Sequence, residues 1–138
     1  MFRIAFILLS CSFVFSPATS FARVSKSHHL HAADPSYSFA LAAANRFLHA
    51  WQTQDHETGI MMLSDEARQR ISPEQLQEFF SPGPAAAFEI QHGKRINGGE
   101  YAFPVTLFGV SGQSLRAHVS SIVITRAGKE DWEVQKLP

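Results

Sequence analysis

The periodicity of the apolar residues changes once along the chain, at Ser81-Pro82-Gly83-Pro84. Before this segment the apolar side chains recur at helical spacing, and after it they alternate with polar ones, as in half-buried strands. Because neither proline can donate a helical hydrogen bond, the segment ends any helix that reaches it. Helices that are followed by strands, rather than alternating with them, predict an α+β fold with an antiparallel sheet.

Capping patterns predict where the helices begin. Asp34 with Pro35 begins a first helix, Asp55 begins a short second one, and Ser64 begins a capped turn. Ser72-Pro73-Glu74-Gln75 is a capping box, which begins a third helix. We therefore expect two or three helices, and we expect the apolar stripe of the first helix to be buried against the sheet. This stripe consists of Ala40, Ala43, Ala44, Phe47, Leu48 and Trp51.

Four strands are expected after the proline-rich segment. Phe88, Ile90 and His92 alternate with polar residues along the first strand, and Asn97-Gly98-Gly99 is the hairpin turn that follows it. The bulky positions of the later strands are Tyr101, Phe103, Val105 and Leu107 in the second, Leu115, Ala117 and Val119 in the third, and Trp132 and Val134 in the fourth.

Two positions predict irregularities in this sheet. Pro104 lies within the second strand, where it has no N–H for the ladder, so we expect an edge position or a bulge. In the third strand the bulky positions change parity from Val119 to Ile122 and Ile124, which a β-bulge at Ser120-Ser121 would explain. Bulges bend sheets, and a bent sheet around the first helix forms a cone whose open end is a natural pocket.

Residues 1–22 have the pattern of a secretory signal peptide. Met1-Phe2-Arg3 supplies a positive charge, and residues 4–15 form a mostly apolar run that is too short for a bilayer span of about 20 residues. Ser20-Phe21-Ala22 offers small residues for cleavage after Ala22, and Ser16-Pro17-Ala18 is a weaker site. This pattern predicts a bacterial protein that is periplasmic or secreted, and free of the membrane once the signal is cleaved.

Cys11 admits a second interpretation, because Leu8-Leu9-Ser10-Cys11 resembles the lipobox of bacterial lipoproteins. A lipobox closes its apolar region, whereas here Phe13-Val14-Phe15 continues beyond the cysteine. We therefore expect Cys11 to be removed with the signal peptide. The mature chain then begins at Arg23 and has no cysteine for a disulfide, a thiol nucleophile or a metal site.

Residues 23–35 are polar, lack periodicity and are interpreted as a flexible tether that carries His28, His29 and His31. Neighbouring imidazoles can bind Zn²⁺ or Cu²⁺, but no helix fixes their geometry in this segment. We therefore expect neither a physiological metal nor a cofactor. Twelve Lys+Arg balance twelve Asp+Glu. This balance argues against a partner that is a nucleic acid, because such binding needs a basic excess or stripe.

Six short motifs, spread over residues 36–138, occur in an order and spacing that match a known family. They are Phe47-Leu48-x-Ala50-Trp51, Gln54-Asp55 (where the family usually shows Gly-Asp), Leu63-Ser64-x-Glu66-Ala67-Arg68, Ser72-Pro73-Glu74-Gln75-Leu76, Tyr101-Ala102-Phe103-Pro104-Val105 and Trp132-Glu133-Val134. By these motifs the chain resembles the nuclear transport factor 2-like superfamily, a cystatin-like α+β group, and in particular its small exported bacterial members of unknown function. The resemblance implies a cone-shaped domain over residues 36–138. Isomerases, cyclases, dehydratases and non-catalytic binders share this fold, so the fold by itself assigns no activity.

Enzymes that this fold resembles place a carboxylate or a histidine inside the cone, often with a tyrosine, to move protons on a bound carbon acid. Alternation predicts that Glu89 and Glu133 point away from the interior. His92 shares the parity of its apolar neighbours, and Tyr101 could supply the hydrogen-bond donor. Arg116 and its neighbour His118 are expected on the other sheet face, where the arginine could bind an acidic ligand.

Two functions follow from these observations. The first is an exported, non-catalytic domain that binds a small apolar ligand or a partner protein through its cone or its sheet face. The partner protein could be a second copy of this chain, in a homodimer formed through the sheet. The alternative is a small isomerase- or cyclase-like enzyme that acts on a hydrophobic carbon acid with His92 and Tyr101. The residues expected to line the pocket in either case are Phe47, Trp51, Phe88, Ile90, His92, Tyr101 and Phe103.

Overall fold

The structure, a computed structural model, describes residues 34–111 and 114–138. The predictions on the signal peptide, on Cys11, on residues 23–33 and on His28, His29 and His31 therefore lie outside the described residues. No helix in the described ranges is both long enough and apolar enough to span a bilayer.

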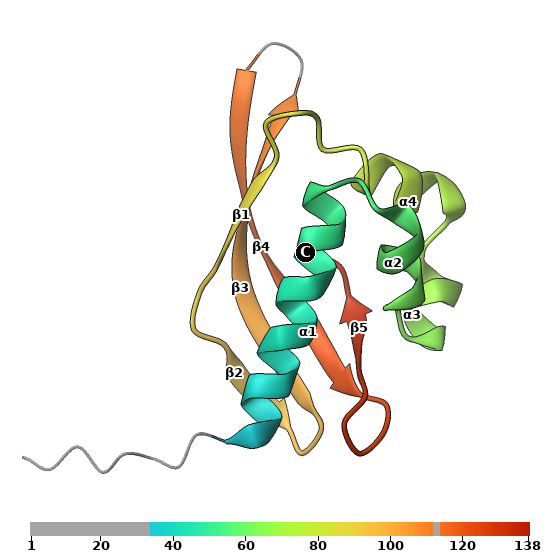
Figure 1. The fold of residues 1–138 in the computed structure, drawn as a ribbon, viewed down its shortest axis with the longest axis vertical. Helices are drawn as coiled ribbons and strands as arrows, with labels where there is room; N and C mark the ends of the chain where they lie inside the picture. The colour runs from blue at the N-terminus through green and yellow to red at the C-terminus, as the bar shows by residue number, and fades with distance from the viewer. Residues whose placement is uncertain (1–33, 112–113) are drawn as a thin grey trace, which may run out of the picture.

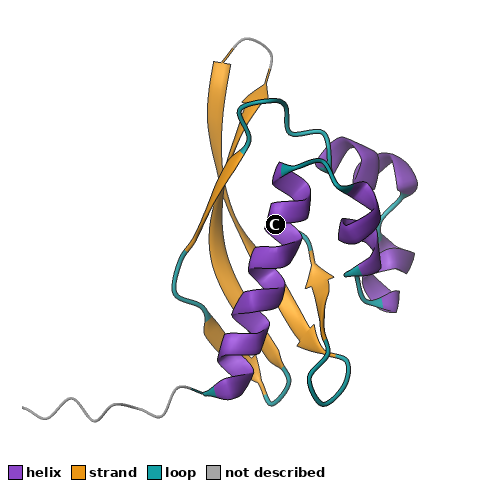
Figure 2. Cartoon of the chain, in the orientation of Figure 1, coloured by secondary structure: helices purple, strands orange, loops and turns teal. Residues whose placement is uncertain are grey.

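Helices precede strands along the described chain, which confirms the predicted α+β class (Figures 1 and 2). The helices are α1 (Pro35–Gln52), α2 (His56–Met61), α3 (Asp65–Arg70) and α4 (Pro73–Phe79). The strands are β1 (Ala87–Ile90), β2 (Lys94–Asn97), β3 (Glu100–Ser111), β4 (Ser114–Arg126) and β5 (Trp132–Lys136).

The caps of the helices are those that the sequence predicts. The Asp34 carboxylate accepts the N–H of Ser36 at 3.1 Å and begins α1. In the capping box of α4, the Ser72 hydroxyl accepts the N–H of Gln75, and the Gln75 side chain accepts the N–H of Ser72. Four helices replace the two or three that we expected, because the capped turn at Ser64 continues as the six-residue α3. Each of these helices starts where a side chain satisfies backbone N–H groups that have no helical partner.

The sheet is antiparallel, with the order β1-β3-β4-β5, and β2 pairs with the same edge of β3 as β1. The single first strand that we expected is thus two strands, separated at residues 91–93, and the sheet has five strands rather than four. Pro104 of β3 lies opposite this break, because its carbonyl accepts the N–H of Gln91 at 2.9 Å. Its nitrogen faces the same side and has no hydrogen to donate, so the neighbouring ladder is interrupted there. The proline occupies a central strand without a bulge in the β3–β4 pairing, contrary to the prediction.

The expected bulge at Ser120-Ser121 is absent, since the β3–β4 register runs without a shift from Glu100↔Thr125 to Ser111↔Ser114. Register shifts are found instead between Val123 and Ile124 in β4–β5, and between Arg95 and Asn97 in β2–β3. Because a strand has a side-chain period of two, the absence of the expected bulge reverses which side chains before Ser120 face the helices.

The two faces of β4 are therefore the reverse of those predicted near its start. His118 is paired with the buried Leu107, and Arg116 with Gly109, so the side chains of Arg116 and His118 lie on the face that α1 covers. Val119 lies on the other face and is 72% exposed.

The core lies between α1 and one face of the curved sheet (Figure 1). The predicted stripe of α1 is buried, except that Ala43 is half-buried. Trp51 is among the buried residues, as expected. The sheet contributes Tyr101, Phe103, Val105, Leu107, Ile122, Ile124, Trp132 and Val134.

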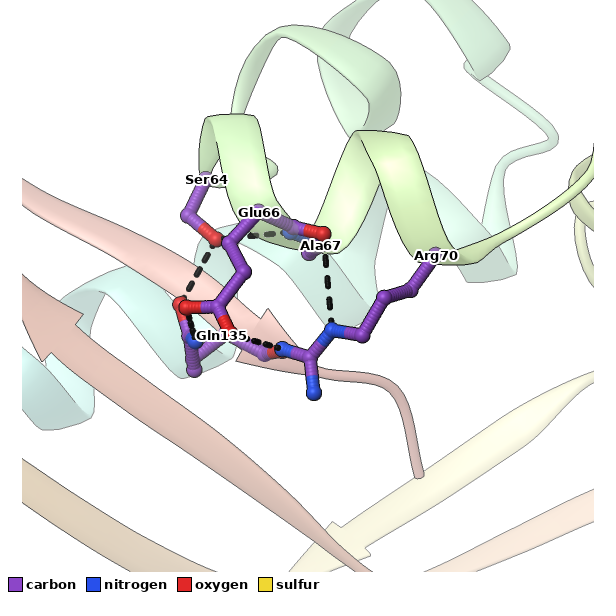
Figure 3. A network of polar contacts seen from close by, with 5 residues as sticks. All are labelled: Ser64, Glu66, Ala67, Arg70 and Gln135. Carbon is purple, nitrogen blue, oxygen red and sulfur yellow. Dashed lines mark hydrogen bonds and ion pairs between the residues drawn. The ribbon is translucent and has the colours of Figure 1, made fainter.

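A polar network joins α3 to β5 (Figure 3). The Ser64 hydroxyl donates to Gln135 Oε1 at 2.7 Å, and it also accepts the N–H of Ala67, which caps α3. The Gln135 amide donates to Glu66, and Arg70 donates to the Gln135 carbonyl at 3.2 Å. Ala67 is the buried residue of α3, so the helix makes few buried apolar contacts. The polar network therefore supplies much of what holds α3 on the last strand.

Candidate functional site

The aromatic residues expected to line a pocket fill the interior of the domain. Phe47, Tyr101 and Phe103 are at most 2% exposed, so their side chains are packed in the core rather than open to a ligand. Phe88 and Ile90 are half-buried at the margin of this core, on β1. A ligand-binding role for these residues stays a prediction.

His92 and Tyr101 both contact Tyr37 of α1, a residue that the sequence did not single out. The Tyr37 hydroxyl lies 3.2 Å from His92 Nδ1 and accepts the N–H of Gly93. The Tyr101 ring lies edge-on to Tyr37, with centroids 5.8 Å apart. His92 is exposed and Tyr101 is buried, so the two candidates occupy different environments around one intervening ring.

The Tyr101 hydroxyl donates to the Asp34 carboxylate at 2.5 Å. Burial of the phenol, together with this carboxylate, raises the pKa of Tyr101, and the donated hydrogen bond lowers the pKa of Asp34. The hydroxyl that could have supported an oxyanion is thus engaged by the residue that caps α1. A tyrosine and an aspartate that are 67 positions apart leave no sequence signal for this contact.

The strand carboxylates have the orientation that alternation predicts. Glu89 is exposed and pairs with Thr106, while Phe88 and Ile90 face the core. Glu133 alternates with buried neighbours and pairs with Thr125 of β4.

A shallow groove of about 390 Å³ lies where the end of α1 and α4 approach the β3–β4 hairpin. Trp51, Phe79 and Leu107 form its apolar floor, and the exposed side chains of Arg116 and His118 lie along it. The other residues of the wall are Glu78, Pro82 and Gly109. A floor of aromatic and aliphatic carbon with an adjacent guanidinium suits an apolar molecule that carries an acidic group.

The glycine at position 109 shapes this groove. A Cβ on Gly109 would come within 3.1 Å of the Pro82 carbonyl, so the absence of a side chain lets the 81–84 segment approach β3. It also leaves the position opposite Arg116 without a side chain.

Of the groove residues, Trp51 is one that the sequence predicts for a pocket, and Arg116 is the one considered for an acidic ligand. The assumed bulge placed Arg116 on the wrong face. Simple alternation back from Ile124 and Ile122 through His118 would have found the correct one.

No group of three or more His, Cys, Asp or Glu side chains is arranged for a metal ion within residues 34–111 and 114–138. The three histidines of the N-terminal segment lie outside these ranges, so the structure does not bear on them.

Solved structures share this arrangement of helices and sheet. A ketosteroid isomerase-like protein from Erwinia carotovora atroseptica aligns with a TM-score of 0.54 over 73% of this chain and 92% of its own, at 14% identity. An NTF-2 like protein of unknown function from Shewanella oneidensis aligns with a TM-score of 0.51 over 71% and 93%, at 12% identity. The fold is nuclear transport factor 2-like. The expectation from the sequence motifs is confirmed at the level of the fold.

A third structure of similar fold is a SEC-C motif-containing protein from Rhodopseudomonas palustris, with a TM-score of 0.52 and 10% identity over 75% of this chain and 88% of its own. No protein-family model matches the sequence, and no curated protein matches it. Identities of 10–14% relate these proteins by fold alone. Within the nuclear transport factor 2-like fold of this chain, the groove at Arg116 and His118 is the candidate site.

Proposed function

We propose that this chain is an exported, non-catalytic domain that binds a small apolar molecule with a carboxylate or similar acidic group in the groove at Arg116 and His118. The observation that carries the proposal is the position of these two side chains on the helix-covered face, beside the apolar floor made by Trp51, Phe79 and Leu107. The signal-like pattern of residues 1–22 supports export.

The chemistry of the groove supports this ligand class. A guanidinium can hold a carboxylate through two parallel hydrogen bonds, and an imidazole N–H adds a donor beside it. Burying an apolar chain against the half-buried Phe79 and the exposed edges of the floor supplies the hydrophobic part of the binding energy, roughly 25 cal/mol per Å² of apolar surface removed from water. A volume of about 390 Å³ falls in the range of small-molecule sites, which is roughly 300–1,000 Å³.

The environments of the candidate acid–base residues support a non-catalytic role. The Tyr101 hydroxyl donates to Asp34, and His92 is exposed beside the Tyr37 hydroxyl. Proton abstraction needs a base within hydrogen-bond reach of a bound carbon acid. Glu89 lies on the sheet face that is turned away from the core, outside such reach.

Tryptophan fluorescence tests the proposal directly, because the chain has two tryptophans and Trp132→Phe leaves Trp51 as the single reporter. Titration with decanoate is expected to change Trp51 emission, and decanol is expected to bind more weakly because it lacks the acidic group. Arg116→Gln should weaken decanoate binding about tenfold and leave decanol unchanged.

The matched control is Lys94→Gln, which removes one exposed positive charge from β2, away from the groove. If decanoate affinity falls equally in the two variants, the loss in Arg116→Gln comes from net charge and not from a contact in the groove. Emission that does not respond to either amphiphile would contradict the proposed site.

A further inference from the structure

A second groove, of about 610 Å³, lies between α1, α2, β5 and the turn that precedes β5. It shares no lining residue with the groove at Arg116. The ligand proposed above gives it no role. We call it the β5 groove, defined by Phe39, Met61, Glu130, Asp131, Trp132 and Glu133.

Two large apolar side chains of the β5 groove are open to solvent. Phe39 of α1 is 47% exposed and Met61 of α2 is 71% exposed. They come from different helices, and the same groove contains both. Exposed apolar side chains gathered at a groove are typical of a surface that another molecule covers.

The charge of the β5 groove is acidic. Glu130, Asp131 and Glu133 contribute three carboxylates along the β5 side, and Arg46 of α1 is the cationic residue of its wall. A net negative potential beside apolar carbon favours an occupant with basic and apolar side chains.

The edge of β5 supplies backbone groups to the same groove. At Val134 this edge is engaged, because its N–H donates to the Met62 carbonyl at 2.8 Å and its carbonyl accepts the N–H of Ser64 at 3.0 Å. Backbone groups alternate in direction along a strand, so Trp132 presents its N–H and carbonyl on this edge too. The Arg126 N–H donates to Gly99 on the side of β3, which agrees with a non-hydrogen-bonded Arg126–Trp132 pair.

No backbone hydrogen bond from the described residues meets Trp132 on that edge. An open strand edge is a template for a further strand. An occupant with backbone carbonyls and N–H groups can therefore pair with the open edge at Trp132, whereas a purely apolar molecule cannot.

We propose that the β5 groove docks an extended peptide segment of a partner protein, with basic side chains alternating with large apolar ones. The peptide backbone pairs with the edge of β5 at Trp132. Its apolar side chains cover Phe39 and Met61, and its basic side chains approach Glu130, Asp131 and Glu133. Edge pairing gives affinity in this mode of recognition, and the side chains give specificity.

Calorimetry with a synthetic heptapeptide that alternates lysine with leucine, capped at both ends, tests the docking surface. The double variant Glu130→Gln/Glu133→Gln is expected to bind it about tenfold more weakly than the parent protein. The control Glu74→Gln/Glu89→Gln removes the same charge outside the groove and should bind as the parent does. An equal loss in both double variants would overturn the proposal, because it would show attraction to net charge alone.

Two further measurements test the apolar contacts and the strand edge. Met61→Ser alters an exposed side chain, so the fold is retained, and peptide affinity is expected to fall severalfold. N-methylation of alternate peptide bonds should abolish binding if the backbone pairs with β5. Binding that survives methylation would contradict the edge pairing.

The basic residues Arg23 and Lys26 of this chain offer a competing occupant. In the full chain, Arg23→Gln/Lys26→Gln is expected to leave peptide affinity unchanged. A marked increase in affinity would identify the chain's own N-terminal segment as the occupant and overturn the proposal of a separate partner.

Discussion

At the scale of single residues, Gln54 has an unusual conformation in the turn between α1 and α2. Its φ is 58°, in the left-handed region that glycine tolerates and other residues avoid. The family that the motifs resemble usually has glycine at this position. The turn is held by hydrogen bonds from Gln54 to Trp51 and from Asp55 to Ala50, so the strain is retained in the folded chain.

Gln54→Gly is therefore expected to raise the free energy of unfolding by about 0.5–1 kcal/mol, because relief of the left-handed strain exceeds the added freedom of the unfolded chain. Urea unfolding measures the change. Thr53→Gly is the matched control: Thr53 has a φ of −89°, so the same replacement there should destabilise. If Gln54→Gly instead lowers the free energy of unfolding, Gln54 is not strained in the folded chain.

Trp51 serves both the core and the floor of the proposed ligand site. It is buried and lies against Phe79 of α4, with ring centroids 6.2 Å apart. Trp51→Ala should lower the free energy of unfolding by about 3–5 kcal/mol, the usual cost of removing a large buried aromatic side chain. A loss below about 1 kcal/mol in urea would place Trp51 outside the core.

At the scale of elements, one side-chain contact joins the start of α1 to β3. Asp34 caps the helix and accepts the Tyr101 hydroxyl, and the same hydrogen bonds lower the pKa of its carboxyl below the ordinary value of 3.8. The folded state therefore holds this proton less tightly than the unfolded state does. The resulting stabilisation is present above about pH 4 and is lost as the pH falls through the lowered pKa.

Asp34→Asn is expected to reduce stability at pH 6 and to reduce it less at pH 2.5, because the native carboxyl gains its proton as the pH falls through its lowered pKa. The difference between the urea midpoints of the parent and of Asp34→Asn, measured at each pH, gives the contribution of the charged carboxylate to stability. In Tyr101→Phe, which lacks the donor, the same difference should shrink. An Asp34→Asn effect that is equal at both pH values would show that the cap acts without its charge.

The elements also explain where the sheet departs from simple alternation. Pro104 faces the gap between β1 and β2, and its missing N–H is accommodated there rather than by a bulge in β3. A proline in a central strand is thus tolerated when one neighbour ends opposite it.

At the scale of the whole molecule, α1 and the sheet form one layer each, and the two grooves lie along different parts of α1. The groove at Arg116 is next to the last turn of the helix, at Trp51, whereas the β5 groove follows its middle turns from Phe39 to Arg46. The two proposed binding functions are therefore separable by mutation, since each groove has its own residues.

The prediction at this scale concerns residues 1–22, whose pattern is that of a signal peptide. When a bacterial host expresses the full chain, we expect the exported form to begin at Arg23, because the pattern at Ser20-Phe21-Ala22 suits signal cleavage. Intact-mass measurement of the exported protein checks this. A lipidated species that begins at Cys11, or an uncleaved chain, would contradict the prediction.

The sequence by itself determined the order of the elements, the starts of the helices and the apolar stripe of α1. These features depend on short-range physics: caps satisfy N–H groups within a turn, and apolar periodicity reports which face of one element is buried. Only the tertiary structure decided the partner of the Tyr101 hydroxyl and the split of the first strand, whereas uninterrupted alternation back from Ile124 and Ile122 would have given the face of Arg116. Each of these depends on a residue elsewhere in the chain, namely Asp34, which is 67 positions from Tyr101, and Pro104, which lies opposite the break. Local patterns do not contain such pairings, because they arise only when distant segments pack together.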